Sequence, residues 1–199
     1  LDSTPQSIFY MFNNADIRFE SVTDRQGNEI GISHGRFVPL LESSDRDLRR
    51  KVFQSYYRSF DQYKNTVAAI FAANLKKELF YTKARHYASS MEAHLSQNNI
   101  PTAVYDQLIE AVHDALPEMY RYVRLRRKML GVEELHMYDV YTPLVSGEHA
   151  SIPFDEAMEI VSRGLTPLGE SYIQLLNEGM HGGWIDRYEN KGKRTGAYS

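Results

Sequence analysis

Glu110 and His113 are the residues whose types and spacing come nearest to a helical metal site. They stand three positions apart, which is the Glu-x-x-His arrangement that carboxylate-bridged di-metal bundles use. Such a centre needs two copies of the motif and two further acids that face one another inside a helical bundle. The spacing alone, which recurs at Glu133–His136 and Glu178–His181, does not establish one. We therefore interpret the pair as ordinary polar residues on a helix flank. A separate metal-binding helical protein stays as an alternative that metal analysis would test.

The sequence also lacks the common motifs of zinc peptidases, nucleotide-binding proteins and enzymes with a nucleophilic Ser or Cys. It has no H-E-x-x-H, so it cannot supply two helical zinc ligands with a general base between them. The segment "ENKGKRTG" at 189–196 lacks a glycine at the right distance before Gly192, and no Ser or Thr follows Lys193, as a P-loop requires. There is no cysteine, and Ser171 lies in a helical pattern instead of a nucleophile elbow. We therefore assign no catalytic residue and no metal ligand.

Two features remain as candidates for binding: a basic stretch and a set of aromatic pairs. The stretch 121–128 holds five basic residues in eight positions. We interpret it as a solvated helix C-terminus, where cations oppose the partial negative charge, paired with Glu133 and Glu134. Phenol rings both pack and hydrogen-bond, so the aromatic pairs are compatible with a peptide cleft, although amphipathic core positions explain them better. The pairs are Tyr56–Tyr57, Phe80–Tyr81, Tyr120–Tyr122 and Tyr138–Tyr141.

The elements that position these residues are mostly helical. Residues 13–41 alternate around the turn sequence "DRQGNE", which predicts a β-hairpin-like segment. A helical body is predicted over 44–181, with Ser44 as the first N-cap. Its first apolar face recurs at spacing four: Leu48, Val52, Tyr56 and Phe60.

Further helices follow, with breaks at proline and glycine. We expect helical runs over about 61–86, from Pro101 to near Gly131, over 155–162 and over 168–180. Pro117 is expected to kink or restart its helix because it lacks an amide hydrogen. A short extended piece is expected at 137–141, and a hairpin or edge strand at 184–199. The fold class is mainly α with small β pieces at both ends.

Composition narrows the class of protein. The chain has 199 residues, 42% hydrophobic and 25% charged, which is typical of a globular domain. A net charge of −3 gives no reason to expect nucleic acid as a partner. No apolar run reaches the roughly 18 residues of a membrane span. The absence of cysteine fits a reducing compartment, and we expect a cytoplasmic protein.

Several stretches of the chain resemble oligoendopeptidase F, a zinc metallopeptidase family related to thimet oligopeptidase. The similarity runs essentially end to end. The most distinctive stretches are "LHMYDVYTPL" at 135–144 and "GKRTGAYS" at 192–199. Others are "FNNADIRF" at 12–19, "HGRFVPLLESSDRDLRRKVFQSYY" at 34–57, "YKNTVAAIFAANLKKELFYTKARHY" at 63–87 and "NNIPTAVYDQLIEAV" at 98–112.

The resemblance implies a multi-helix segment of a metallopeptidase channel fold, with a deep channel that admits short peptides. In the family, an H-E-x-x-H helix and a downstream glutamate bind one zinc, and that motif follows "GAYS". This sequence ends at Ser199. We therefore expect a single partial domain, 1–199, whose partners are short peptide substrates and the remainder of a parent chain. Zinc is expected in the parent, with its ligands outside this sequence.

The resemblance also implies where substrate binds. The "GAYS" segment looks like a strand beside the active site, which would hydrogen-bond an extended substrate backbone. We expect Gly196, Ala197 and Tyr198 to contact the substrate, with Tyr138 and Tyr141 as weaker candidates. The segment would thus form a wall of the channel and be inactive alone. The alternative is a non-catalytic helical interaction module built on the same scaffold.

Overall fold

The computed structural model describes residues 3–145, 152–188, 190 and 193. The described residues divide into two compact units, one up to Leu144 and the other from Val145 to Lys193. The fold is mainly helical, as predicted, with one small antiparallel sheet among the described residues. The predicted helical body, 44–181, extends through both units. None of the described helices is long and apolar enough to cross a membrane.

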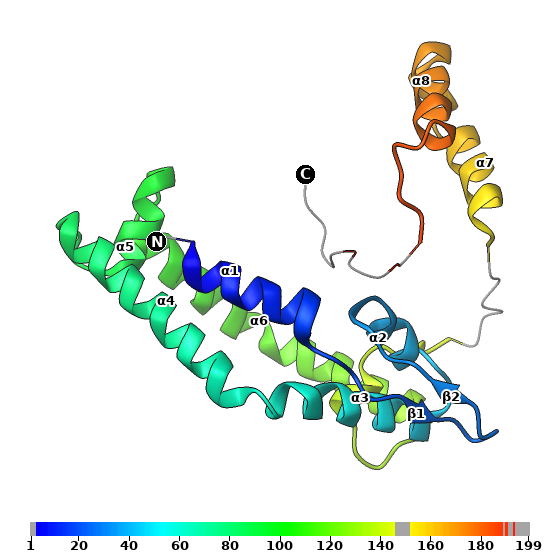
Figure 1. Ribbon diagram of the computed structural model, residues 1–199, viewed down its shortest axis with the longest axis horizontal. Helices are drawn as coiled ribbons and strands as arrows, with labels where there is room; N and C mark the ends of the chain where they lie inside the picture. Colours follow the sequence, from blue (N-terminus) through cyan, green and yellow to red (C-terminus); the bar gives the residue numbers. More distant parts are fainter. Residues whose placement is uncertain (1–2, 146–151, 189, 191–192, 194–199) are drawn as a thin grey trace. The chain divides into compact units, whose positions relative to one another are not determined.

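The first unit holds most of the regular structure (Figure 1). Its α-helices are α1 (Thr4–Met11), α2 (His34–Leu41), α3 (Arg46–Asp61), α4 (Lys64–Ala84), α5 (Ser90–Leu95) and α6 (Thr102–Met129). Its strands are β1 (Val22–Thr23) and β2 (Glu29–Ile30). Short turns of other helix types are the π-helical Phe12–Asp16 and the 3-10 segments Ser96–Asn98 and Met137–Asp139. Figure 1 shows α1 lying along α4, and the hairpin beside α2 and α3.

The core of this unit forms where the hairpin, α2 and α3 meet. Ile32, Leu41, Leu48 and Val52 are buried together there, and Val52 is fully inaccessible. The spacing of Leu48 and Val52 is the one that predicted the helix, because residues four apart share a face. The N-cap of α3 is Asp45, not Ser44 as expected: the Asp45 carboxylate accepts hydrogen bonds from the amides of Asp47 and Leu48.

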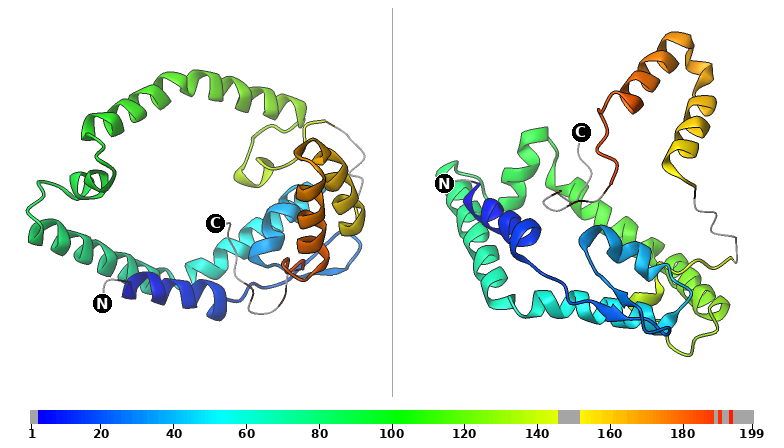
Figure 2. Two further views of the ribbon diagram at one scale, coloured as in Figure 1. Left: turned by 90° about the horizontal axis from the view of Figure 1, so that it is seen from above. Right: turned by 45° about the vertical axis from the view of Figure 1, so that its right-hand side comes forward.

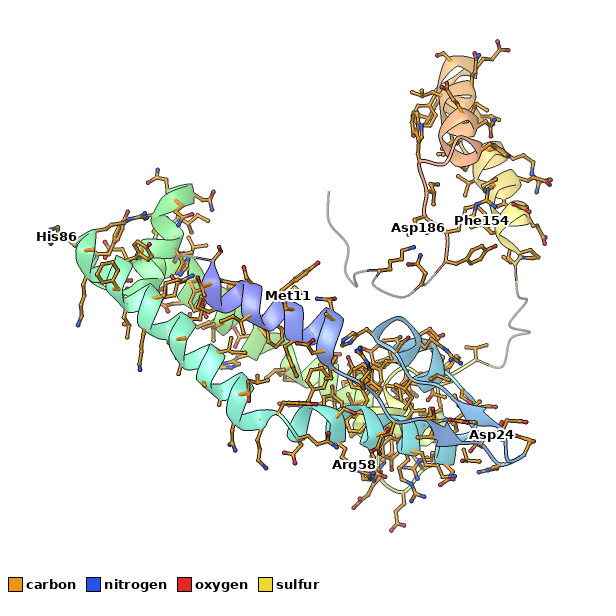
Figure 3. The ribbon with its side chains drawn as sticks, viewed as in Figure 1. Met11, Asp24, Arg58, His86, Phe154 and Asp186 are labelled. Atoms are coloured by element: carbon orange, nitrogen blue, oxygen red, sulfur yellow. The ribbon has the colours of Figure 1, made fainter. Side chains whose placement is uncertain are left out.

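The predicted hairpin is present but much shorter than 13–41. Val22 pairs with Ile30, and the turn is closed by Asp24, whose carboxylate accepts from the amides of Gln26 and Asn28. Figure 3 shows Asp24 at this turn. The expected second arm is wrong beyond residue 33, because His34–Leu41 is the helix α2. The Ser33 hydroxyl accepts from the Arg36 amide, and this cap favours a helix over a continued strand.

Two further expectations are corrected in the long helix and the loop after it. α6 runs from Thr102 to Met129 through Pro117, so of the two effects expected of this proline, a restart of the helix does not occur. Residues 137–141 are not extended, since Met137–Asp139 is a 3-10 turn. That turn forms because the Asp139 carboxylate accepts a hydrogen bond from the His136 amide at 3.0 Å.

The second unit contains α7 (Phe154–Gly164), a 3-10 turn (Thr166–Leu168) and α8 (Glu170–His181). Met158 and Met180 are its buried apolar residues among those described. Phe154, labelled in Figure 3, lies at the start of α7 beneath the Arg187 guanidinium, 4.4 Å from the ring centre. Trp184 packs over Gly179 so closely that a Cβ there would lie 2.6 Å from the indole. Residues 184–188, the described start of the predicted 184–199 hairpin, form no strand.

Candidate functional site

The structure describes two of the five predicted substrate-binding residues. Tyr138 and Tyr141 lie in the segment after α6, which we call the 131–144 loop. Gly196, Ala197 and Tyr198 lie outside the described residues. The candidate site is therefore built from the 131–144 loop and the helices α3 and α6 that hold it.

Asp139 is the centre of this loop and its side chain is fully buried. Its carboxylate receives Arg49 Nη2 at 2.7 Å on Oδ1 and Arg46 Nη2 at 3.0 Å on Oδ2. Arg46 Nε also donates to Oδ1, at 3.1 Å. Both arginines come from the first turns of α3, three residues apart, so they reach the loop from one face of that helix. Asp139 thus joins the loop to α3 by charge-assisted hydrogen bonds.

These contacts control the protonation of Asp139. Burial raises the pKa of its carboxyl, but the hydrogen bonds from Arg46, Arg49 and the His136 amide outweigh burial and lower the pKa from 3.8 to about 2. The carboxylate is therefore ionised throughout the physiological pH range. A permanently charged, fully bonded aspartate is suited to holding a loop and not to exchanging protons with a substrate.

Arginine side chains also hold the backbone of the loop. Arg126, near the end of α6, is buried, and its guanidinium donates to the carbonyl oxygens of Asp139 and Thr142. Arg49 Nε donates to the Tyr138 carbonyl at 3.1 Å, and Arg46 Nη2 donates to the Glu134 carbonyl at 2.9 Å. Carbonyl oxygens that have no partner in a helix or sheet are thereby satisfied. The loop is fixed from both α3 and α6.

This finding corrects the interpretation of the basic stretch 121–128. Arg126 was expected to be solvated near the acidic pair Glu133 and Glu134, yet its side chain is only 6% exposed. The burial of Arg126 could have been predicted from its position in the sequence, since it falls on the same helical face as Val123 and Met119. A charged residue on an apolar face is buried only with hydrogen-bond partners. The sequence did not reveal that those partners are the carbonyl groups of a loop 13 to 16 residues away.

The two tyrosines of the loop have different surroundings. Tyr138 stacks on His136 with ring centres 4.9 Å apart, meets Phe53 edge-on at 6.1 Å, and packs against the central core. Tyr141 is 50% exposed. Tyr138 therefore acts as a packing residue that fixes the loop, whereas about half of the surface of Tyr141 is open to the surroundings. Of the two candidates, Tyr141 is the one whose geometry suits contact with a ligand.

The aromatic pair Tyr56–Tyr57 belongs partly to the core. Tyr56 stacks on Phe19 and Phe37 at 4.6 and 4.0 Å, and its hydroxyl is 2.8 Å from His34 Nδ1. Burial raises the pKa of Tyr56. The second His34 nitrogen lies 2.8 Å from the Asn13 carbonyl, so Nε2 carries the proton and the Tyr56 hydroxyl donates to Nδ1 when the imidazole is neutral. This cluster explains Tyr56 as a structural residue.

The described residues do not fit a zinc site. A catalytic zinc takes three protein ligands from His, Cys, Asp or Glu. Within residues 3–145, 152–188, 190 and 193, no three such residues are grouped closely enough to hold a metal ion. Glu110 and His113 are both exposed on α6. No catalytic step is therefore assigned to a metal held by this part of the chain.

Comparison with known proteins gives consistent matches over nearly the whole chain. The sequence model of peptidase family M3 matches residues 39–199. Oligopeptidase PepF of Bacillus subtilis (strain 168) is 46% identical over 191 residues, which are 96% of this chain and 28% of that protein. Group B oligopeptidase PepB of Streptococcus agalactiae serotype III (strain NEM316) is 41% identical over 96% of this chain and 32% of its own length.

A solved structure agrees with these sequence matches. The crystal structure of oligoendopeptidase-F from Enterococcus faecium aligns with a TM-score of 0.70 and 37% identity. The alignment covers 90% of this chain and 33% of that one. The chain therefore spans about a third of the length of the relatives that it matches.

Proposed function

The chain belongs to peptidase family M3, and from this membership we propose that it is one segment of a longer zinc-dependent metalloendopeptidase that hydrolyses short peptides. The observation that carries the proposal is the 46% identity to an oligopeptidase over 96% of this chain. The same match covers 28% of that relative, so the segment corresponds to a part of such an enzyme. The partners of the segment are then the remainder of the parent chain and the peptide substrate.

We assign the zinc ligands to the part of the parent outside this sequence. The described residues bring together no group of three His, Asp or Glu side chains that would serve. The segment contributes structure and substrate contacts in this scheme. The cytoplasm is the proposed compartment, since a chain without cysteine is compatible with a reducing environment.

The proposed role of the segment is to form a wall of the substrate channel through the 131–144 loop. The loop backbone is held by Arg46, Arg49 and Arg126. A backbone fixed in this way presents Tyr141 in one position, which reduces the entropy lost when a peptide binds. The Tyr141 ring would pack against an apolar substrate side chain and its hydroxyl would hydrogen-bond a peptide group. Gly196, Ala197 and Tyr198 remain proposed contacts to the substrate backbone.

The test uses the full-length product of the gene that contains this chain, with a quenched fluorescent peptide as substrate. Tyr141→Ala is expected to raise KM or lower kcat/KM by about tenfold, because about 1.4 kcal/mol of binding energy is a factor of ten. Tyr120→Ala is the matched control, since Tyr120 is 51% exposed, like Tyr141, and lies on α6 outside the 131–144 loop. Equal kinetics for the two variants would refute the role of Tyr141.

The same assay separates the proposal from its alternative. A non-catalytic interaction module would leave the full-length product without peptidase activity. Chelator-sensitive cleavage by the full-length product supports the zinc peptidase. Absence of cleavage after addition of zinc would support the module.

A further inference from the structure

α6 carries two apolar stripes that run along almost its whole length. Their members alternate at spacings of four and three, apart from one spacing of seven in the second stripe, and this places each stripe on one side of the helix. The first stripe is Tyr105, Ile109, Val112, Leu116, Met119 and Val123. The second is Val104, Leu108, Ala111, Ala115, Tyr122, Leu125 and Met129, and Glu118 interrupts it between Ala115 and Tyr122.

Neither stripe is covered by the described residues of the first unit. Val112, Met119 and Leu108 are 52%, 56% and 61% exposed. The buried residue of this helix is Arg126, which the 131–144 loop covers. Figure 2 shows that α4 and α6, joined through α5, lie apart along most of their lengths. A helix of 28 residues is about 42 Å long, and an exposed apolar surface of that extent marks an interaction site.

The spacing of the stripes indicates helices as their partners. Alternating spacings of three and four form the seam of two helices that cross at about 20°. The stripes are offset by one residue, or about 100° around the helix, so a single partner helix cannot cover both. A two-fold dimer of this chain would bring one α6 against one stripe and leave the other exposed.

We propose that two helices from the rest of the parent polypeptide dock on the two apolar stripes of α6. The inference rests on the proposed function, because it takes the chain as one segment of a longer protein. The relatives supply the argument for this partner: they are about three times as long as the segment that they match. The polar side of α6, which includes Glu110 and His113, stays uncovered.

Amide hydrogen exchange of residues 104–125 tests the proposal in the full-length product and in the 199-residue chain. Exchange is expected to be at least about 100-fold slower in the full-length product, because covered helices open only with larger units of structure. In that product, Val112→Asp is expected to speed exchange by about 30-fold or more. His113→Asp is the matched control, since it introduces the same charge at the next residue on the exposed polar side, and is expected to change exchange by less than about threefold.

If Val112→Asp prevents folding while His113→Asp does not, Val112→Ala provides the milder change and is expected to speed exchange by about fivefold. Equal exchange in the two lengths of chain would overturn the proposal. Slow exchange in the 199-residue chain that depends on its concentration would also overturn it, in favour of self-association.

Peptidase activity is measured on the same full-length sample. Cleavage by a product whose α6 exchanges rapidly overturns the docking inference alone. A protected α6 in a product that cleaves no peptide overturns the proposed function alone.

Discussion

Asp139→Asn is the substitution that most directly probes how the 131–144 loop is held. It preserves the size of the side chain and an oxygen that can accept from the His136 amide, but it removes the negative charge between Arg46 and Arg49. Arg49 is only 3% exposed, so its guanidinium would be left buried without an ion-pair partner. Breaking a buried pair in this way costs about 3 kcal/mol.

The lowered pKa of Asp139 gives a second measure of how much these contacts stabilise the folded state. A carboxyl whose pKa falls from 3.8 to about 2 on folding contributes about 2 kcal/mol of stability at neutral pH, at about 1.4 kcal/mol per pKa unit. The folded state binds the proton less readily than the unfolded state. The contribution is therefore complete above about pH 5 and is lost as the pH falls from about 4 to 2.

The assay is urea unfolding of the 199-residue chain at pH 7 and pH 2.5, followed by far-ultraviolet circular dichroism. Asp139→Asn is expected to lower the free energy of unfolding by about 2–3 kcal/mol at pH 7 and by much less at pH 2.5. Asp106→Asn, on the exposed polar side of α6, is the control and should have little effect at either pH. A loss below about 0.5 kcal/mol at pH 7, or one that is the same at both pH values, would refute the reasoning.

Two other substitutions test separate parts of the structure. Arg126→Met is expected to lower the free energy of unfolding by about 2–4 kcal/mol, because the buried carbonyls of Asp139 and Thr142 lose their hydrogen-bond donor. Urea unfolding measures this loss, and a change within about 0.5 kcal/mol would contradict the role of Arg126 in holding the loop. Gly179→Ala is expected to displace Trp184, since the new Cβ would lie 2.6 Å from the indole. Trp184 is the one tryptophan of the chain, so its fluorescence maximum reports the displacement directly, and an unchanged spectrum would count against the packing.

The sequence predicted those parts of the fold that depend on local pattern. Leu48 and Val52 stand four residues apart and both belong to the core. Apolar residues at this spacing share one face of a helix, and that face is the buried one. The second arm of the hairpin was predicted wrongly over 34–41, since a short apolar run fits a strand or a helix and the Ser33 cap decides for the helix. Local patterns were sufficient for the long helices and insufficient for this short one.

The candidate site could be predicted only in part. Tyr138 and Tyr141 were selected from a distinctive stretch of sequence, but nothing local distinguishes the packed ring from the exposed one. Asp139 was missed as the centre of the loop because its partners Arg46 and Arg49 are about 90 residues away in the sequence. Contacts over such separations depend on the tertiary fold, which residue spacing does not reveal.

In the proposed function, this segment supports substrate binding in a zinc peptidase and holds no zinc itself. Metal content and peptide cleavage, measured side by side for the full-length product and the 199-residue chain, test it most directly. We expect one zinc ion per full-length molecule with chelator-sensitive cleavage, and neither stoichiometric zinc nor cleavage for the 199-residue chain. Tightly bound zinc or chelator-sensitive cleavage in the 199-residue chain would contradict the claim.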